Sequence, residues 1–369
     1  MKIPLSKPVL DDEMTEAAIA ALQNEKFVMG ESVFKFEEDF AKYCGVKHAT
    51  STSSGTFALQ FALQALGIGQ KTRVITTPYS FVATSNAALW AGATPVFADI
   101  DPKTYNINAE LAKQELNNET KAIIPVHLYG FPADMQAISD LFDDHGCAVV
   151  EDACQAHGAE FRGRKTGSLG DVGCFSFYPS KNMTVCGDGG MATTNDEDVA
   201  FKIAKLRDCG RKSHYEHDCI GMTARLNTVN AAIGRVQLKK LDMWNEKRRA
   251  CARMYDHLLK DIESLTLPPG ESSVVKPVYH LYVIRTTLRD ELKDRLESFG
   301  IQCGVHYPLP IHLQPIYRSL FGYKEGDFPE SELVSKSVLS LPMFPDLEKE
   351  EVEYVCEKVH EFFDTRHET

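Results

Sequence analysis

The sequence predicts an α/β protein with a mainly parallel, wound sheet, followed by a smaller α+β domain. Strand-like and helical segments alternate from about residue 74 to 153 at the spacing of βαβ units. A long helical pattern from Asn230 to about Ile262 then leads into shorter mixed elements. The chain of 369 residues is also long for one core. We therefore expect a large domain over 1–245 and a small one over 246–369, with an N-terminal segment that could pack on the small domain.

Composition and charge argue against some classes of function and favour one cellular compartment. The net charge of −12 argues against a nucleic-acid-binding surface. No leader pattern opens the chain, and no apolar run reaches the roughly 18 residues of a membrane span. The ten cysteines form no CxxC pair, and Cys147, Cys154 and Cys174 lie in apolar, strand-like runs. Buried thiols of this kind are typical of a reducing compartment, so we expect a cytoplasmic protein.

The N-terminal part alternates helices and loops. We expect a helix from the acidic residues 11–13 to about Gln23, a loop at Phe27–Gly30, and a second helix over 32–43. A turn rich in hydroxyls and glycine, Ala49–Thr56, then opens onto a helix over 57–66. Free N–H groups at such a helix start can bind an anion; the alternative is simple capping by Ser or Thr.

The remaining elements follow from hydrophobic periodicity. Strands are expected at 74–77, 95–100, 122–126, 148–153 and 174–177, with helices at 82–91, 111–116 and 134–145. Gly190–Thr194 is expected as an antiparallel strand, and Lys247–Arg249 as the solvated face of the long helix. The small domain is expected to contain a strand (279–285), a helix (289–299), a Pro/His-rich loop (306–315) and a terminal helix (349–363).

Lys181 stands at the point that organises the chain. It follows a strand-like run that Pro179 ends, and it precedes the glycine cluster Gly187–Gly190. An open α/β sheet places its chemistry at such strand ends. Taken alone, the same pattern also fits a solvated lysine at a loop start.

Lys181 and Asp152 together point to pyridoxal phosphate. A free lysine has a pKa near 10.4, so lowering it to about 7 takes roughly 4 kcal/mol, which burial and a nearby cation can supply. The cofactor also needs an acid for its ring nitrogen, and Asp152 ends a predicted strand. No GxGxxG follows a strand, so a nicotinamide cofactor is not expected.

Other residues suit the rest of the cofactor. The turn Ser54-Gly55-Thr56 provides a helix start for the phosphate, and Ser176 could add a hydroxyl. Phe81, just past a strand, could stack on the ring, although taken alone it fits a core position better.

The chain resembles the DegT/StrS family of nucleotide-sugar aminotransferases over nearly its whole length. The motifs that carry the resemblance occur in order: Ser54–Thr56, Glu151–Gly158, Phe175–Asn182, Gly187–Gly190, Arg207–Arg211, Val305–Pro308, Ile311–Pro315 and Ser340–Pro342. Several separate matches in the right order are far more specific than any one of them.

The resemblance implies a fold-type-I transferase that depends on pyridoxal phosphate and forms a homodimer with shared active sites. Lys181 would form the imine with the cofactor and move the proton, while Asp152 would pair with the ring nitrogen. Gln155 would contact the ring's hydroxyl side, Phe81 would stack, and Gly55, Thr56 and Ser176 would bind phosphate. The implied reaction moves an amino group from glutamate to a keto group of a nucleotide-linked sugar, in amino-sugar or polysaccharide biosynthesis.

Two positions depart from the family pattern. Thr223 stands where an Asn usually reaches the partner subunit's cofactor phosphate, so the contact in trans is in doubt. Cys154 stands where Ala is usual, a small change in volume.

Candidate substrate contacts come from two loops. Met29 lies in the loop at Phe27–Gly30, and His306, Tyr307 and His312 lie in the Pro/His-rich loop. Loop packing is the alternative for each. Cys209, His214, His217 and Cys219 have no spacing that fits a zinc site, so no metal is expected.

Two other functions remain open from the sequence. A dehydratase with the same cofactor would have a histidine in place of Lys181, so this lysine favours transamination. A regulatory protein could bind the cofactor without turnover, but Lys181 and Asp152 together argue against it.

Overall fold

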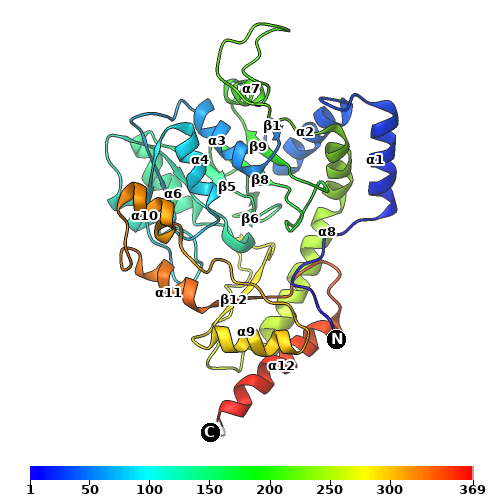
Figure 1. The fold of residues 1–369 in the computed structure, drawn as a ribbon, viewed down its shortest axis with the longest axis vertical. Helices are drawn as coiled ribbons and strands as arrows, with labels where there is room; N and C mark the ends of the chain where they lie inside the picture. The colour runs from blue at the N-terminus through cyan, green and yellow to red at the C-terminus, as the bar shows by residue number, and fades with distance from the viewer. Residues whose placement is uncertain (368–369) are drawn as a thin grey trace.

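A computed structural model describes residues 1–367 and has a seven-stranded sheet at its centre (Figure 1). The strand order is β1 (His48–Thr52), β9 (Gly190–Thr194), β8 (Val172–Ser176), β5 (Ala148–Asp152), β4 (Thr120–Ile124), β2 (Arg73–Thr76) and β3 (Thr94–Phe97). The strands from β8 to β3 are mutually parallel, and β9 runs antiparallel to both of its neighbours. The predicted wound sheet, with an antiparallel strand after Lys181, is confirmed.

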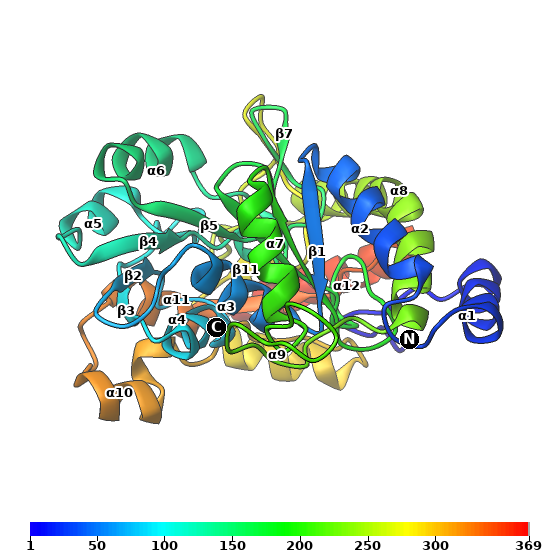
Figure 2. The same ribbon diagram turned by 90° about the horizontal axis from the view of Figure 1, so that it is seen from above.

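Helices cover both faces of this sheet (Figure 2). One face carries α3 (Gly55–Ala65), α4 (Ala83–Ala91) and α7 (Glu197–Leu206). The other carries α2 (Glu31–Cys44), α5 (Ala109–Gln114), α6 (Met135–Phe142) and the first part of α8 (Thr228–Leu259). Successive strand residues alternate between these faces, so Val150 packs with α3 and α4, whereas Val149 packs with α5 and α6.

The C-terminal part builds a second core on the end of α8. Strands β11 (Tyr282–Arg285) and β12 (Val338–Leu341) pair antiparallel, and α9 (Arg289–Ser298) and α12 (Lys349–His367) pack against them. The N-terminal Ile3 joins this core and pairs with Ile301, whereas α1 (Asp12–Asn24) packs on α8. Helix α8 is continuous through the expected domain boundary between residues 245 and 246. The division into two domains at that point stays a prediction.

Several elements were not predicted, and most of them are too short to show a period. They are β1, the strands β6 (Glu160–Phe161), β7 (Arg164–Lys165), β10 (Val275–Lys276) and β12, the helices α7, α10 (Pro315–Phe321) and α11 (Pro329–Ser337), and the 3-10 helices η1 (Leu128–Gly130), η2 (Asp143–His145) and η3 (Ile311–Leu313). Part of the expected 306–315 loop is therefore helical.

Two predictions about local structure were wrong. Residues 49–56 are not one turn, because β1 ends at Thr52 and α3 begins at Gly55. The run Lys247–Arg249 is not a solvated face, because Arg248 and Arg249 are buried. Arg248 donates to the carbonyls of Tyr279, His280 and Met343, which lie next to β11 and β12. Backbone carbonyls from distant parts of the chain thus take the place of water as hydrogen-bond acceptors for the buried guanidinium of Arg248.

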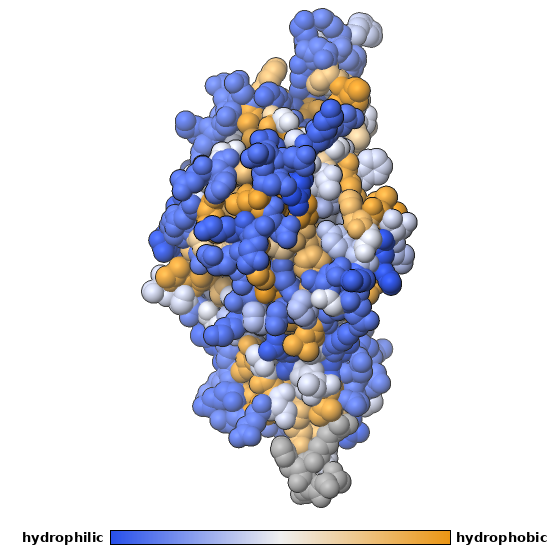
Figure 3. Space-filling model, turned by 90° about the vertical axis from the view of Figure 1, so that its left-hand side faces the viewer, coloured by the Kyte–Doolittle hydropathy of each residue, from blue (hydrophilic) through white to orange (hydrophobic). Residues whose placement is uncertain are grey.

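The surface is mostly polar on the side that bears α10 and α11, with apolar residues in small separate groups (Figure 3). Within residues 1–367, no helix combines the length and apolar character that a membrane span requires.

Candidate active site

A cavity of about 480 Å³ opens at the carboxyl ends of β5 and β8. Most of the residues predicted to bind cofactor or substrate line it: Ser54, Gly55, Thr56, Phe81, Asp152, Gln155, Ser176, Lys181, His306 and Tyr307. They come from segments more than 250 positions apart in the chain. The fold therefore assembles the predicted set in one place.

Lys181 reaches this cavity from the turn that follows β8. Burial lowers the pKa of its amine, while the thiol of Cys154 and the carboxylate of Asp152 act in the opposite direction. A lowered pKa makes the neutral, nucleophilic amine available at a smaller cost in free energy.

Asp152 ends β5 and turns its carboxylate toward α4. Its Oδ2 accepts a hydrogen bond of 2.7 Å from the hydroxyl of Thr84, and its Oδ1 accepts one of 3.2 Å from the amide of Cys154. Asp152 is only 5% exposed, so these two donors determine its orientation. An oriented carboxylate in a buried site is suited to bind a protonated ring nitrogen.

The start of α3 forms an anion-binding turn. Ser54 caps the helix and its Oγ accepts from the amide of Phe57, which leaves the first amides, those of Gly55 and Thr56, without an acceptor inside the helix. A Cβ on Gly55 would lie 2.8 Å from Cys154 Sγ and from Ser176 Cβ. Only glycine therefore lets this backbone approach the floor of the cavity, where a phosphate would meet free N–H groups.

Gln155 and Tyr307 line the same cavity and are hydrogen-bonded to each other. Gln155 Oε1 accepts from the amide of Tyr129 at 2.8 Å, and its Nε2 donates to the hydroxyl of Tyr307 at 3.1 Å. Burial raises the pKa of Tyr307, so its phenol stays protonated. The ring of Phe81, 56% exposed, lies 6.2 Å from the ring of Tyr307. An aromatic face thus stays open to a planar ligand.

These features fit pyridoxal phosphate. A buried amine, a held carboxylate, a glycine turn at a helix start and an open aromatic ring share one cavity. When bound, this cofactor supplies a pyridine ring that withdraws electrons from the carbon bearing the transferred nitrogen. Lys181, Asp152 and the turn at Ser54–Thr56 would hold it.

The structure does not bring every candidate into this cavity. Met29 packs against the cluster that contains Val33 and Phe36. His312 is fully buried, with its Nε2 3.0 Å from Oε1 of Glu332. Neither residue lines the cavity of this chain, so their expected role in substrate contact stays a prediction. Thr223 lies in an exposed segment, 3.2 Å from Cys209 Sγ, outside the cavity of its own chain.

Sequence reasoning missed several residues that line the cavity: Leu5, Ser6, Ser80, Thr84, Tyr178 and His280. Burial, and then the charge of Lys181, lowers the pKa of His306 to about 4 and that of His280 well below its ordinary value. Both imidazoles are therefore neutral beside the lysine. His306 was predicted from its place in the matched motif Val305–Pro308, whereas nothing in the sequence marks His280.

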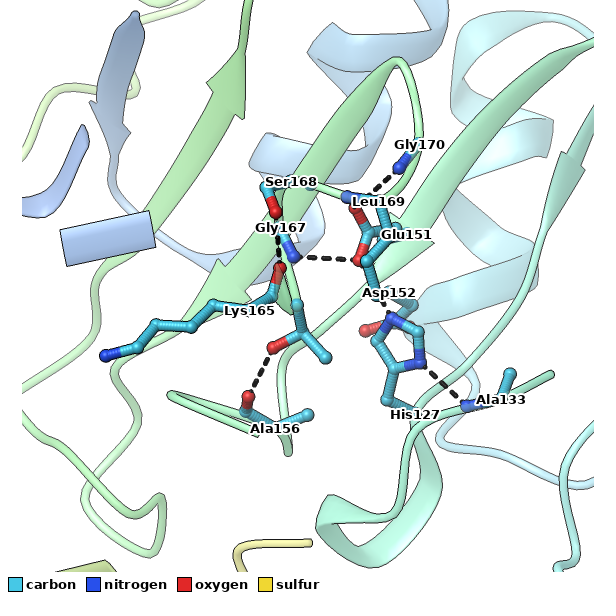
Figure 4. A network of polar contacts seen from close by, with 12 residues as sticks. His127, Ala133, Glu151, Asp152, Ala156, Lys165, Gly167, Ser168, Leu169 and Gly170 are labelled. Atoms are coloured by element: carbon cyan, nitrogen blue, oxygen red, sulfur yellow. Dashed lines mark hydrogen bonds and ion pairs between the residues drawn. The ribbon is translucent and has the colours of Figure 1, made fainter. Parts of the chain in front are cut away.

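Glu151, next to Asp152, belongs to a separate buried network on the opposite face of the sheet (Figure 4). Its carboxylate accepts hydrogen bonds of 2.7–2.8 Å from three amides of the turn before β8, those of Gly167, Leu169 and Gly170. His127 Nε2 lies 3.0 Å away. The amide of Ala133 donates to His127 Nδ1, so the imidazole in its neutral form carries its proton on Nε2 and donates to Glu151.

No group of three or more His, Cys, Asp or Glu side chains is arranged to hold a metal ion anywhere in residues 1–367. Gly210, at φ +68°, lies so close to the Cys219 carbonyl that a Cβ would clash. His214, His217 and Cys219 are exposed on the loop that contains this close backbone contact.

Comparisons with known proteins agree with the site. The DegT/DnrJ/EryC1/StrS aminotransferase family model matches residues 8–360. The "Pleiotropic regulatory protein" of Geobacillus stearothermophilus is 44% identical over 355 residues, 96% of this chain and 95% of that protein. The "dTDP-3-amino-3,4,6-trideoxy-alpha-D-glucose transaminase" of Streptomyces venezuelae is 40% identical over 349 residues, 94% of this chain and 92% of that protein.

A solved structure extends the comparison to the fold. S. venezuelae DesV in complex with ketimine intermediate superposes with a TM-score of 0.94 at 38% identity, covering 98% of each chain. The predicted fold class is confirmed by this match. The chain belongs to the DegT/DnrJ/EryC1/StrS aminotransferase family, and its cofactor is pyridoxal phosphate.

Proposed function

We propose that this protein transfers an amino group from glutamate to a keto group of a nucleotide-linked sugar. The placement of Lys181 and Asp152 in one cavity carries the proposal, because transamination needs a basic amine and a partner for the ring nitrogen. The S. venezuelae relative, named as a transaminase of a dTDP-linked amino sugar, supports the substrate class.

Each residue has a distinct task in this proposal. The Nζ of Lys181 takes a proton from the carbon that carries the nitrogen and later returns one. Asp152 holds the ring nitrogen, the turn at Gly55 and Thr56 fixes the phosphate, and Phe81 covers the ring face. Tyr307 and His306 lie at the wall where the sugar would enter.

We propose a homodimer in the cytoplasm, with Thr223 reaching the partner subunit's site. Exposed apolar residues that precede Thr223 in the chain, Tyr215 at 88% and Ile220 at 93%, support burial of this segment against a second copy. All ten cysteines are free thiols, which supports a reducing compartment. Thr223→Val should raise the dissociation constant of the cofactor severalfold, measured by dialysis and absorbance; an unchanged constant removes the contact.

The first experiment joins two assays. Borohydride reduction of the purified protein, digestion and mass spectrometry should find a pyridoxyl adduct on Lys181. A panel of nucleotide-linked keto-sugars with glutamate should then yield an amino sugar from at least one member. Turnover of glutamate without any product from a broad panel would remove the sugar part of the proposal.

A second candidate function is regulation. The 44% identical relative is named as a regulatory protein, so binding of cofactor without turnover remains a specific alternative. Formation of 2-oxoglutarate from glutamate in a single turnover distinguishes the two functions. Its absence in cofactor-loaded protein would favour the regulatory alternative.

A further inference from the structure

A line of two hydroxyls leads to the Asp152 carboxylate. Thr84 Oγ1, in the first turn of α4, lies 2.7 Å from Asp152 Oδ2, and Ser80 Oγ lies 2.9 Å from Thr84 Oγ1. Thr84 is 1% exposed and Ser80 is 4% exposed, and both line the cavity. No motif of the sequence singles out either residue.

The donor direction along this line can be worked out. An ionised carboxylate only accepts hydrogen bonds, and a hydroxyl has a single proton to donate. The hydroxyl of Thr84 therefore donates its hydrogen bond to Asp152, and the Thr84 oxygen accepts a hydrogen bond from the hydroxyl of Ser80. The hydrogen bonds thus run from Ser80 to Thr84 and from Thr84 to Asp152, and each of the two hydroxyl protons is used in one of them.

The element that carries Thr84 is rigid. Ala87 and Ala88 of α4 are fully buried against the sheet, so the helix cannot shift without disturbing the core. Threonine is also restricted at χ1 in a helix. An aspartate, by contrast, rotates broadly about χ2 unless its oxygens are held. The other oxygen of Asp152 has only the longer bond, 3.2 Å, from the amide of Cys154.

We infer that Thr84 is a positioning residue for the cofactor: supported by Ser80, it fixes the Asp152 carboxylate where it meets the protonated ring nitrogen. This inference rests on the proposed aminotransferase function and adds a second element, α4, to the machinery. Without Thr84 the carboxylate rotates, and the ring nitrogen spends less time protonated and paired.

The test compares four holoenzyme variants with the wild type. Thr84→Val keeps the shape of the side chain and removes its hydroxyl, whereas Thr84→Ser restores the hydroxyl. Ser80→Ala removes the outer hydroxyl only. Ser85→Ala is the matched control, because Ser85 is a fully buried residue of the same helix whose hydroxyl bonds the carbonyl of Val82 instead.

Two readouts are needed. The ¹⁵N chemical shift of ring-labelled cofactor reports protonation of the ring nitrogen, and single-turnover kinetics with glutamate report the half-reaction. Thr84→Val should move the shift toward the unprotonated value and slow the half-reaction about tenfold to a hundredfold, the range seen when an orienting hydrogen bond to a ligating group is lost. Thr84→Ser and Ser85→Ala should match the wild type, and Ser80→Ala should show a smaller change in the same direction.

A wild-type shift in Thr84→Val overturns the inference, even if the rate falls, because a loss of packing alone slows the reaction without changing ring protonation. If Thr84→Val fails to bind cofactor, the Ser80→Ala variant provides the test. An unchanged ¹⁵N shift of the cofactor in Ser80→Ala overturns the inference as well. Only glutamate and cofactor are used, so failure of the keto-sugar panel would leave this result standing.

Discussion

Two neighbouring carboxylates on β5 show how position separates a binding role from a structural one. Glu151 faces α5 and α6, is fully buried, and has four hydrogen-bond donors around it. Asp152 faces α3 and α4 and has two. A carboxylate offers about four lone-pair sites, so Glu151 is saturated and Asp152 keeps about half of its capacity for a ligand. The number of unused lone pairs distinguishes the two residues better than burial does.

The largest effect should come from Lys181→Ala, on the cavity side of this comparison. Turnover should fall by about 10³-fold or more, because no second amine among residues 1–367 lines the cavity to move the proton. The melting temperature should change little. Steady-state kinetics and thermal unfolding check both parts, and a near-normal rate would remove the assignment of Lys181.

Asp152→Asn tests the carboxylate with free lone pairs. An amide keeps one acceptor for Thr84 but loses the negative charge opposite the ring nitrogen, so kcat should fall by about 10²-fold to 10³-fold. The free energy of unfolding, measured by denaturant titration, should change by less than about 1 kcal/mol. Unchanged kinetics would mean that another group balances the ring charge.

Glu151→Gln is the matched change on the other face. The glutamine amide would point its N–H₂ at backbone donors that now face an oxygen, so the free energy of unfolding should fall by about 3 kcal/mol. The kcat of the protein that remains folded should stay within about threefold of the wild type. Equal losses of stability in Glu151→Gln and Asp152→Asn would contradict the division of roles.

Buried histidines extend the comparison to pH. His127 has a carboxylate partner, whereas His157 packs between Phe175 and Phe177, and burial, followed by the charge of Lys181, lowers its pKa to about 3. As the pH falls below about 6.5, the unfolded chain takes up this proton first, so stability is lost from there downward. By pH 5 the loss should be about 2 kcal/mol for this histidine.

His157→Phe removes that group and keeps a ring of similar size. It should unfold with a shallower pH dependence between 6.5 and 5, measured by denaturant titration at several pH values. At pH 8 the two proteins should differ only by packing. An identical pH slope in both would show that His157 does not titrate with unfolding.

The sequence was most informative where a physical pattern is local. Short apolar runs predicted β2, β4 and β5, and the motif Ser54-Gly55-Thr56 predicted the start of a helix. Thr84 could not be predicted, because it sits in an ordinary helical stretch and its partner lies 68 residues away. Arg248 was wrongly predicted to be solvated for the same reason: its acceptor, the Met343 carbonyl, becomes a neighbour only in the folded chain. The burial of His312 against Glu332 was likewise not visible in the sequence.

The pairing of the two ends of the chain has a consequence for synthesis. The amide of Ile3 donates to the Gly300 carbonyl, and the carbonyl of Leu5 accepts from the amide of Met343. The N-terminal residues, which are synthesised first, therefore cannot form these hydrogen bonds until Gly300 and Met343 have been synthesised. Stalled ribosome-bound chains of increasing length should show the N-terminal segment protected from protease only after Met343 has emerged, and earlier protection would mean that it finds another partner on the way.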